Sequence, residues 1–374
     1  MKKKIKIALI ATSDFTFKSF MLTNIKRLSK DFNLLICCNN ALSIKKFIPK
    51  NVSLNNINFV RKPNLLIDIV SFFSLLYFFL KNKPYLTISL TPKAGFLTAL
   101  ASFIARVSYR IHWFTGQLWV TKKGLTRVFY KILDKVIFLL SHHVLVDSNS
   151  QKKFLISTGI IRKQKSTVLL NGSVGGVNIK KFKYSNKERN IFRKKLKIRK
   201  NDFIFLYLGR INRDKGIIEL IKAFKKIDKF YKVFLILVGP IEENFIKNYI
   251  KQNKKVIYAG KTNNPEKWFS VGDIICLPSF REGFGSVIIE AGACNLPALG
   301  SNIYGISDAI EQNKTGILHK VGNVNDIKNK MLFAIKNKKL LKKYGQRARK
   351  RVKKKFEENL LSQHFLEFIN SRIS

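Results

Sequence analysis

Short apolar runs alternate with longer segments of helical character along most of the chain. Runs that are apolar throughout are typical of parallel strands buried on both faces. In chain order, the expected strands are Ile5–Ile10, Asn33–Cys38, Ser53–Val60, Tyr85–Leu90, Tyr109–His112, His143–Asp147, Thr167–Leu170, Phe203–Leu208, Val233–Val238, Lys255–Ala259, Asp273–Leu277, Pro297–Gly300 and Thr315–Leu318. Their alternation with helices implies parallel sheets with right-handed crossovers. The pattern therefore predicts the α/β fold class.

A glycine-rich stretch divides the expected strands into two groups. The chain has 374 residues, and a single hydrophobic core rarely grows past about 250–300 residues. Asn171–Asn178 carries three glycines between the last strand of the first group and the second group. We therefore expect two domains, with residues 1–175 in the first and 176–355 in the second.

The segment Arg281–Glu290 follows the expected strand Asp273–Leu277 and carries two carboxylates, Glu282 and Glu290. Glu282 falls in the loop at the carboxyl end of that strand, where open α/β sheets bind ligands. A helix begins near Gly285, and N–H groups at a helix start bind phosphate. With Glu290 further along the helix, the segment suits a sugar nucleotide. The alternative is an ordinary loop with surface acids.

A second strand end carries two cations. Leu206–Gly216 has the pattern of a strand and a glycine turn, and a helix follows it from Ile217 to Ile227. Arg210 and Lys215 lie within that turn and are expected to hold a diphosphate. In a chain this basic, both can also be ordinary surface residues. Glycines at the two ends of the turn favour the binding site.

Polar residues also follow strands in the first domain. Ser13 and Asp14 lie in the expected loop Ala11–Phe17, ahead of a helix from about Lys18 to Ser29. Thr91 and Lys93 follow the strand Tyr85–Leu90. They are expected to face a ligand, and Lys93 to meet an acceptor phosphate, unless it is a surface lysine.

A histidine ends the strand that begins at Tyr109. His112 is one of five histidines and stands close to Gly116, which favours a functional role over a place in the core. Thr115, Gly116 and Gln117 are expected to shape an acceptor pocket. Trp113 and Trp119 provide either a stacking face for a sugar or core packing.

Together these segments resemble the family 4 glycosyltransferases, which are retaining sugar-nucleotide enzymes of the GT-B fold. The resemblance rests on Gly209-Arg210…Lys215-Gly216, Val238-Gly239-Pro240, Asp273…Leu277-Pro278-Ser279, Glu282-Gly283-Phe284-Gly285…Glu290-Ala291, Gly292–Ala298 and Gly305-Ile306. The order and spacing of so many pieces make it specific.

The resemblance implies two Rossmann-like parallel-sheet domains that face each other across a cleft. The first would be an acceptor domain, with the C-terminal helix 356–374 packing back on it. The second would be the nucleotide-sugar donor domain. The implied reaction moves a hexose or N-acetylhexosamine from a nucleotide sugar, with a UDP-sugar favoured. Its acceptor would be lipid-linked or a surface polysaccharide, in bacterial polysaccharide, lipopolysaccharide or capsule biosynthesis.

The family also implies roles for individual residues. The catalytic group is His112, Arg210, Lys215 and Glu282, in which the two cations stabilise the departing diphosphate, Glu282 binds sugar hydroxyls and His112 lines the sugar side. The donor-binding group is Gly209, Lys261, Gly283, Phe284, Gly285, Ser286, Val287 and Glu290, in which Glu290 binds the ribose and the backbone near Lys261 meets the base. The acceptor-side group is Ser13, Asp14, Thr91, Lys93, Thr115, Gly116 and Gln117.

Two positions depart from the family pattern. Many relatives carry glycines in the first loop, whereas this chain has none before Phe20. An acid is common where Asn178 stands. How the first loop handles its ligand, and what Asn178 does, are therefore open.

Charge adds a candidate partner. The chain has 71 Lys and Arg against 22 Asp and Glu, a net charge of +49, which fits anionic membrane surfaces and phosphorylated substrates. Part of the excess reflects AT-rich coding. The alternative function is a non-catalytic basic protein on a degenerate GT-B fold that binds membrane or nucleic acid. Zinc-finger spacing and an RNA-recognition pattern are both absent, so no specific nucleic acid is expected. The sequence has no feature that indicates a phosphorylase or an epimerase.

The last expectations concern membrane association, metals and cofactors. Leu65–Leu80 is apolar but contains Asp68 and is shorter than the ~20 residues that a span needs. It is expected as a buried or interfacial helix of a cytoplasmic protein, peripherally associated with the inner face of the cytoplasmic membrane. The four cysteines lack metal-ligand spacing and read as buried thiols. We expect no metal and no cofactor besides the nucleotide-sugar co-substrate.

Overall fold

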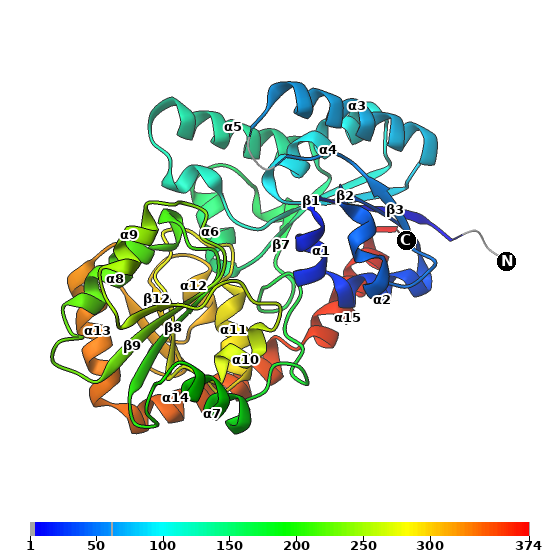
Figure 1. Cartoon of the computed structure of the whole chain (residues 1–374). Helices are drawn as coiled ribbons and strands as arrows, with labels where there is room; N and C mark the ends of the chain where they lie inside the picture. The colour runs from blue at the N-terminus through cyan, green and yellow to red at the C-terminus, as the bar shows by residue number, and fades with distance from the viewer. Residues whose placement is uncertain (1–3, 61–62, 374) are drawn as a thin grey trace. The chain divides into compact units, whose positions relative to one another are not determined.

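The computed structural model describes residues 4–60 and 63–373. The chain forms two compact units, which are described separately. Unit 1 comprises Met1–Gly176 and Glu358–Ser374, and unit 2 comprises Val177–Glu357. The expected boundary after residue 175 lies one residue before the observed one. In each unit, helices cover both faces of a parallel sheet (Figure 1).

Unit 1 is built on a seven-stranded sheet in the order β3-β2-β1-β4-β5-β6-β7. Every neighbouring pair is parallel. The strands are β1 (Lys6–Ser13), β2 (Asn33–Asn39), β3 (Ser53–Asn56), β4 (Leu86–Leu90), β5 (Tyr109–Phe114), β6 (His143–Val146) and β7 (Ser166–Thr167). The strand order reverses between β1 and β4, which is where open α/β sheets bind ligands.

Helices pack on both faces of this sheet because successive β1 residues point to opposite sides. Ile7 and Leu9 belong to one apolar cluster, with α1, α2 and α15, while Ala8 and Ile10 belong to another, with α3 and α4. The helices are α1 (Asp14–Phe20), α2 (Leu22–Asp31), α3 (Leu65–Asn82), α4 (Pro92–Ile104), α5 (Gly124–Leu140), α6 (Asn149–Ser157), α15 (Glu358–Ile373) and the 3-10 helices η1 (Ala41–Phe47), η2 (Leu118–Thr121) and η3 (Lys163–Lys165).

The first strand and helix differ from expectation. The predicted loop Ala11–Phe17 is wrong: β1 continues to Ser13, and α1 begins at the next residue. Ala11 is fully buried, so the apolar run that defines the strand extends one position further than the loop assignment assumed. The single helix expected from Lys18 to Ser29 is divided at Met21, which leaves the helical region with φ −120°.

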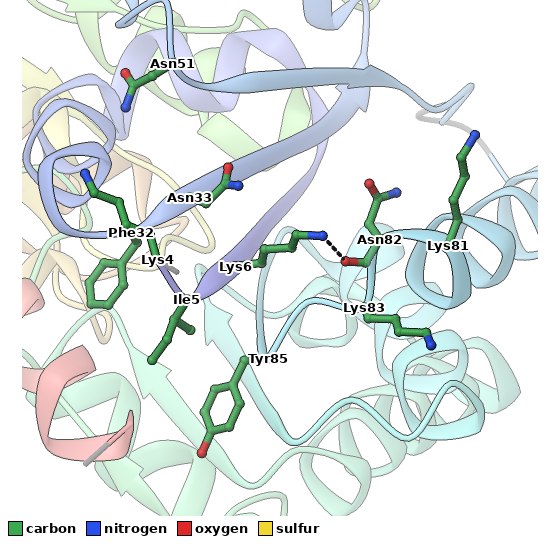
Figure 2. A pocket seen from close by; sticks show the side chains of 10 residues that line it. All are labelled: Lys4, Ile5, Lys6, Phe32, Asn33, Asn51, Lys81, Asn82, Lys83 and Tyr85. Atoms are coloured by element: carbon green, nitrogen blue, oxygen red, sulfur yellow. Dashed lines mark hydrogen bonds between the residues drawn. The ribbon is translucent and has the colours of Figure 1, made fainter. Parts of the chain in front are cut away.

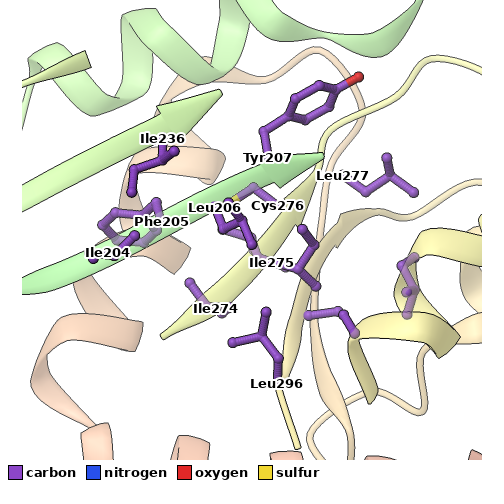
Figure 3. Packing of buried hydrophobic residues seen from close by; sticks show 14 of the residues in the cluster. Ile204, Phe205, Leu206, Tyr207, Ile236, Ile274, Ile275, Cys276, Leu277 and Leu296 are labelled. Carbon is purple, nitrogen blue, oxygen red and sulfur yellow. The ribbon is translucent and has the colours of Figure 1, made fainter. Parts of the chain in front are cut away.

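Unit 2 is built on a six-stranded parallel sheet in the order β10-β9-β8-β11-β12-β13. Its strands are β8 (Phe203–Leu208), β9 (Val233–Val238), β10 (Val256–Tyr258), β11 (Ile274–Leu277), β12 (Ala298–Ser301) and β13 (Gly316–His319). Figure 3 shows β8 and β11 lying side by side with buried Leu206, Ile274 and Ile275. The order reverses between these two strands.

The helices of unit 2 are α7 (Asn186–Lys195), α8 (Ile217–Lys225), α9 (Ile246–Lys251), α10 (Pro265–Phe269), α11 (Ser286–Ala293), α12 (Ile306–Ala309), α13 (Val324–Lys336), α14 (Lys338–Lys355) and the 3-10 helix η4 (Arg213–Lys215). The charged segment Phe182–Asn201 is helical only in its middle, where α7 lies. Its start is set by Ser185, whose hydroxyl accepts a hydrogen bond from the backbone N–H of Glu188, as an N-cap residue does.

The two parallel sheets confirm the predicted Rossmann-like architecture. Both strand orders reverse next to residues that the sequence singled out. Ser13 and Thr91 end or follow β1 and β4, while Gly209 and Glu282 follow β8 and β11. The fold therefore places a group of polar residues at the strand ends of each unit.

Candidate active site

In unit 2, the turn after β8 depends on its glycines. Gly209 has φ +154°, and a side chain at Gly239, which follows β9, would overlap the Gly209 carbonyl. The turn is held from inside by Tyr207, whose buried hydroxyl donates to the Arg210 carbonyl at 2.6 Å. These contacts fix the position of the Arg210 backbone at the strand end.

The same turn brings Arg210 to a carboxylate. Its guanidinium lies 3.2 Å from a Glu242 oxygen, and Asn212 donates to the same carboxylate at 2.6 Å. Asn212 also accepts from the backbone N–H of Lys215 at 3.1 Å, which caps η4. One amide side chain therefore connects the positions of both predicted cations.

Lys215 pairs with Glu282, which is the central contact of this site. Each side chain is 15% exposed, so the pair is shielded but still accessible. Ser279 donates to the same Glu282 oxygen at 2.9 Å. Sequence reasoning named both members of the pair but placed them on different groups of the ligand, and it did not predict their contact.

The turns after β8 and β11 are held together at two further points. Gly216 has φ +66°, and a Cβ there would overlap the Pro278 carbonyl. Arg281 donates to Asp214 at 2.8 Å across the same pair of turns. Because both turns are fixed to each other, the Lys215 ammonium and the Glu282 carboxylate are preorganised.

Helix α11 begins beside this pair. Gly285 precedes the helix with φ +81°, a conformation that glycine adopts without strain. The first N–H groups of a helix have no partner within the helix and attract anions. Phe284 is buried against Phe356, which secures the start of the helix. The predicted donor residues Gly283–Gly285 thus lead directly into α11, whose first two residues are Ser286 and Val287.

Glu290 lies further along α11. Burial raises the pKa of its carboxyl to about 7, although nearby Lys181 lowers it, and Glu266 adds to the increase. Within residues 4–60 and 63–373 we find no hydrogen-bond partner for this carboxylate. Lys261 is exposed just after β10 and does not contact the Lys215–Glu282 pair.

In unit 1, the carboxyl half of β5 carries His112. The ring is 2% exposed, and its Nδ1 shares a hydrogen bond of 2.8 Å with the hydroxyl of Ser89 on β4. A Cβ on Gly95 would lie 2.6 Å from Nδ1, so only glycine leaves room for the ring. Burial lowers the pKa of His112 to about 3. The imidazole is therefore neutral at physiological pH.

Next to it, the end of β4 is strained. Thr91 has φ +70°, which is rare for a β-branched residue. Its hydroxyl lies 2.6 Å from the Thr12 hydroxyl and accepts from the Thr12 backbone N–H at 3.2 Å. Strain of this type persists where neighbouring contacts impose it, and it concentrates at functional sites. Thr12 joins the site without having been predicted.

The predicted acceptor-side residues separate into two groups. Asp14 is held by Lys18 at 2.7 Å and by Ser43 at 2.6 Å, while Lys93 pairs with Asp68 of α3 at 2.7 Å. Gln117 is fully buried, and its carbonyl accepts from Gln151 at 3.0 Å. These three side chains take part in contacts within unit 1. Partly exposed positions remain at Ser13, Thr91, Thr115 and Gly116.

Trp113 and Trp119 are core residues, so the sugar-stacking alternative is wrong. Both are almost completely buried, and Trp119 donates to the buried Asp134 at 2.8 Å. Burial raises the pKa of that carboxyl to about 7, and the hydrogen bond from Trp119 lowers it. The sequence offered no signal that separates a stacking tryptophan from a packed one.

Sequence reasoning missed several residues that support the site: Thr12, Ser89, Asn212, Glu242 and Ser279. Each holds a predicted residue in place through a hydrogen bond. The available signal was a polar residue within four positions of a strand end. Such residues are common, so the signal is weak.

In the part of the chain that the structure describes, no group of three or more His, Cys, Asp or Glu residues has the arrangement of a metal site. Cys37, Cys38, Cys276 and Cys294 are all buried thiols.

The fold and the strand-end groups define the class of protein. Two Rossmann-like parallel sheets make a GT-B architecture, and the structure of HepE from Anabaena in complex with UDP and glucose superposes with a TM-score of 0.81, covering 98% of this chain and 100% of that one at 19% identity. The family model "Glycosyl transferases group 1" matches residues 188–351.

Curated relatives establish the family. The capsular polysaccharide biosynthesis glycosyltransferase CapM of Staphylococcus aureus is 31% identical over 310 residues, which is 81% of each chain. An Escherichia coli enzyme, UDP-Gal:alpha-D-GlcNAc-diphosphoundecaprenol alpha-1,3-galactosyltransferase, is 23% identical over 81% of this chain and 80% of its own. The chain belongs to the group 1 glycosyltransferases, which confirms the family 4 resemblance.

Proposed function

We propose that the protein is a retaining glycosyltransferase that moves a hexose or N-acetylhexosamine from a nucleotide sugar, with a UDP-sugar as the favoured donor. The acceptor is lipid-linked or a surface polysaccharide, reached at the inner face of the cytoplasmic membrane during polysaccharide, lipopolysaccharide or capsule assembly. The observation that carries the proposal is the shielded Lys215–Glu282 pair beside the start of α11. The Escherichia coli relative is named for a UDP-sugar donor and a diphosphoundecaprenol acceptor, and the Staphylococcus aureus relative for capsular polysaccharide biosynthesis, which supports these donor and acceptor classes.

The cations serve the leaving group. A departing nucleoside diphosphate gains charge in the transition state, and preorganised donors that stabilise such charge usually supply the largest part of catalysis. Lys215 is held by Glu282 and Arg210 by Glu242, so both are ordered before the donor binds. Backbone N–H groups of Gly285–Val287 add to the positive electrostatic potential at the diphosphate. We expect turnover without added metal because these groups supply the positive charge, and activity in excess EDTA checks this expectation.

The two carboxylates serve hydroxyl groups. Glu290 lacks a protein hydrogen-bond donor among the described residues and is partly buried, and two ribose hydroxyls would satisfy it. Glu282 keeps further acceptor positions besides those used by Lys215 and Ser279, and these would take sugar hydroxyls. Lys261 and its neighbours would meet the nucleobase.

Unit 1 supplies neutral groups. His112 is fixed through Nδ1 by Ser89, so Nε2 remains for a hydroxyl of the donor sugar. Ser13, Thr91, Thr115 and Gly116 are proposed to line the acceptor position. Asp14, Lys93 and Gln117 would act there indirectly, because each already has a partner in unit 1.

Donor binding is tested by thermal unfolding with UDP, GDP, ADP and dTDP, alone and as sugar conjugates. A ligand at 100 times its Kd stabilises a protein by about 2.7 kcal/mol. We expect one nucleotide to raise the Tm of the wild type and not that of Glu290→Ala. The matched control is Glu219→Ala on α8, which should respond like the wild type. If no nucleotide raises the Tm while nucleic acid or anionic vesicles do, the non-catalytic basic protein replaces the transferase.

A further inference from the structure

Helix α3 is apolar on its exposed side as well as on its buried side. Among the described residues it is the one helix that by length and composition could cross a membrane. Its exposed apolar side chains are Leu65, Leu66, Ile69, Val70, Phe73, Tyr77 and Leu80. They recur every three or four positions, so they lie along one stripe. A stripe of this kind gains nothing from facing water.

The opposite side of α3 is fixed to unit 1. Leu75, Phe78 and Phe79 are buried in the cluster that α3 shares with α4 and the sheet. Ser71 donates to the Asn58 carbonyl at 2.8 Å, and Asp68 pairs with Lys93 of α4. Crossing a bilayer would require these contacts to break. The helix therefore meets any membrane lengthwise.

Helix α5 repeats the arrangement. Leu125, Val128, Phe129 and Ile132 are all more than half exposed, and Leu125 reaches 87%. Helix α4 packs against both α3 and α5, and Phe103 and Ile104 at its end are exposed too. Figure 1 shows α3 and α5 on either side of α4 over one face of the seven-stranded sheet. We call the exposed residues of these three helices the α3–α5 face.

Cations border this face at both helices. Lys122, Lys123 and Arg127 are exposed at the start of α5. Lys81 and Lys83 are exposed at the end of α3, where they line a hollow of about 710 Å³ at the amino ends of β1, β2 and β4 (Figure 2). Lys4 and Lys6 line the same hollow, and Lys6 donates to the Asn82 carbonyl at 2.9 Å.

We infer that the α3–α5 face is the docking surface for an anionic lipid bilayer: its apolar side chains enter the boundary between headgroups and acyl chains, and the bordering lysines and arginine bind lipid phosphates. Monomeric soluble proteins seldom expose apolar patches of more than a few hundred Å² unless they are interaction sites. Helices that lie in a membrane interface combine apolar residues with Lys and Arg in this way.

Charge selects a bilayer over a second copy of the chain. Two α3–α5 faces brought together would oppose their lysines and arginines, in a protein whose net charge is already +49. An anionic membrane pairs with the same residues. The inference deepens the proposed function, on which it rests only for a membrane-bound acceptor.

The test is co-flotation of the full chain with phosphatidylcholine vesicles, with and without phosphatidylglycerol. We expect binding that requires phosphatidylglycerol and that falls at least tenfold in the double variant Val70→Asp, Phe73→Asp. Both positions are exposed, so folding should persist. The matched control is Ile191→Asp, Phe230→Asp, two exposed apolar residues of unit 2 that carry the same change of charge. It should bind like the wild type.

Three outcomes overturn the inference. These are no binding of the wild type to either vesicle, equal loss in the two double variants, and a concentration-dependent dimer that Val70→Asp, Phe73→Asp dissociates in sedimentation velocity. Nucleotide-induced Tm shifts should be the same in all these variants. A loss of vesicle binding with intact nucleotide shifts therefore separates the docking surface from the donor site.

Discussion

Different kinds of contact hold the predicted site residues at the strand ends of the two units. In unit 2, charged groups hold one another, as Lys215 does with Glu282 and Arg210 with Glu242. In unit 1, neutral groups do so, as Ser89 does with His112 and Thr12 with Thr91. A diphosphate needs charge at a fixed place, whereas sugar hydroxyls need hydrogen bonds of fixed direction. The contrast therefore matches a division of work between leaving group and sugar.

The largest effect should follow from removing the charge in unit 2. We expect Lys215→Ala to lower kcat by about 10²–10³, as the loss of one preorganised charge contact often does. The variant also leaves Glu282 without its cation. The measurement is steady-state turnover of the preferred donor, with Lys222→Ala, an exposed lysine of α8, as control. Near-wild-type kcat in a folded Lys215→Ala protein would show that turnover does not depend on the charged contacts of unit 2.

A smaller effect should follow from disturbing the neutral site of unit 1. We expect Gly95→Ala to lower kcat about 10–100-fold because the added methyl displaces the His112 ring, and overpacking of this kind costs ~1–3 kcal/mol. His112→Ala should lower kcat as well. If Gly95 acts through His112, the double variant should match His112→Ala alone. Additive losses would instead show that Gly95→Ala disturbs unit 1 more widely.

The same contrast explains how much the sequence could predict. Charged motif residues such as Arg210, Lys215 and Glu282 are recognisable because few other reasons place them beside paired glycines. The strands of both sheets and their parallel arrangement were predictable from the apolar runs. Ser89 and Thr12 were not, because a hydroxyl in a strand acquires a role only when a neighbouring strand brings it a partner.

The sequence also did not show which of these apolar side chains are buried. Trp113 and Trp119 follow the predicted site residue His112 in the chain and yet point into the core. In contrast, one side of α3 is apolar and exposed, whereas the sequence left the whole helix as either buried or interfacial. Composition alone therefore assigned these two groups poorly, since apolar residues pack inward only where the fold supplies a neighbour.

The protonation state of Glu290 tests whether unit 2 needs a negative charge at this position. Its pKa in the folded protein is about 7 against 4.5 for the free group, so the folded state holds the proton more tightly. The free energy of unfolding without donor should then fall by up to about 3 kcal/mol as pH rises from about 4.5 to 7. In Glu290→Gln this part of the pH dependence should vanish, as chemical denaturation at several pH values would reveal.

As pH rises, donor affinity should change in the opposite direction to the free energy of unfolding. Ribose hydroxyls donate to a carboxylate, so nucleotide affinity should rise as Glu290 loses its proton near pH 7. Affinity should become flatter with pH in Glu290→Gln. An unchanged profile in this variant would assign the titration to another group and would separate Glu290 from the donor.

The smallest effect concerns Lys93, a cation in the unit whose Ser89–His112 and Thr12–Thr91 contacts join neutral groups. Its ion pair with Asp68 is partly shielded, with 18% and 22% of the two side chains exposed, and pairs near the surface contribute up to about 1 kcal/mol. If Lys93 only joins α3 to α4, Lys93→Met should lower the free energy of unfolding by up to about that amount and leave both KM values unchanged. A selective rise in the KM of the acceptor would instead show that Lys93 binds an acceptor phosphate, so unit 1 would use charge as well. Asp68→Asn is the matched variant, because it breaks the same pair and keeps the lysine.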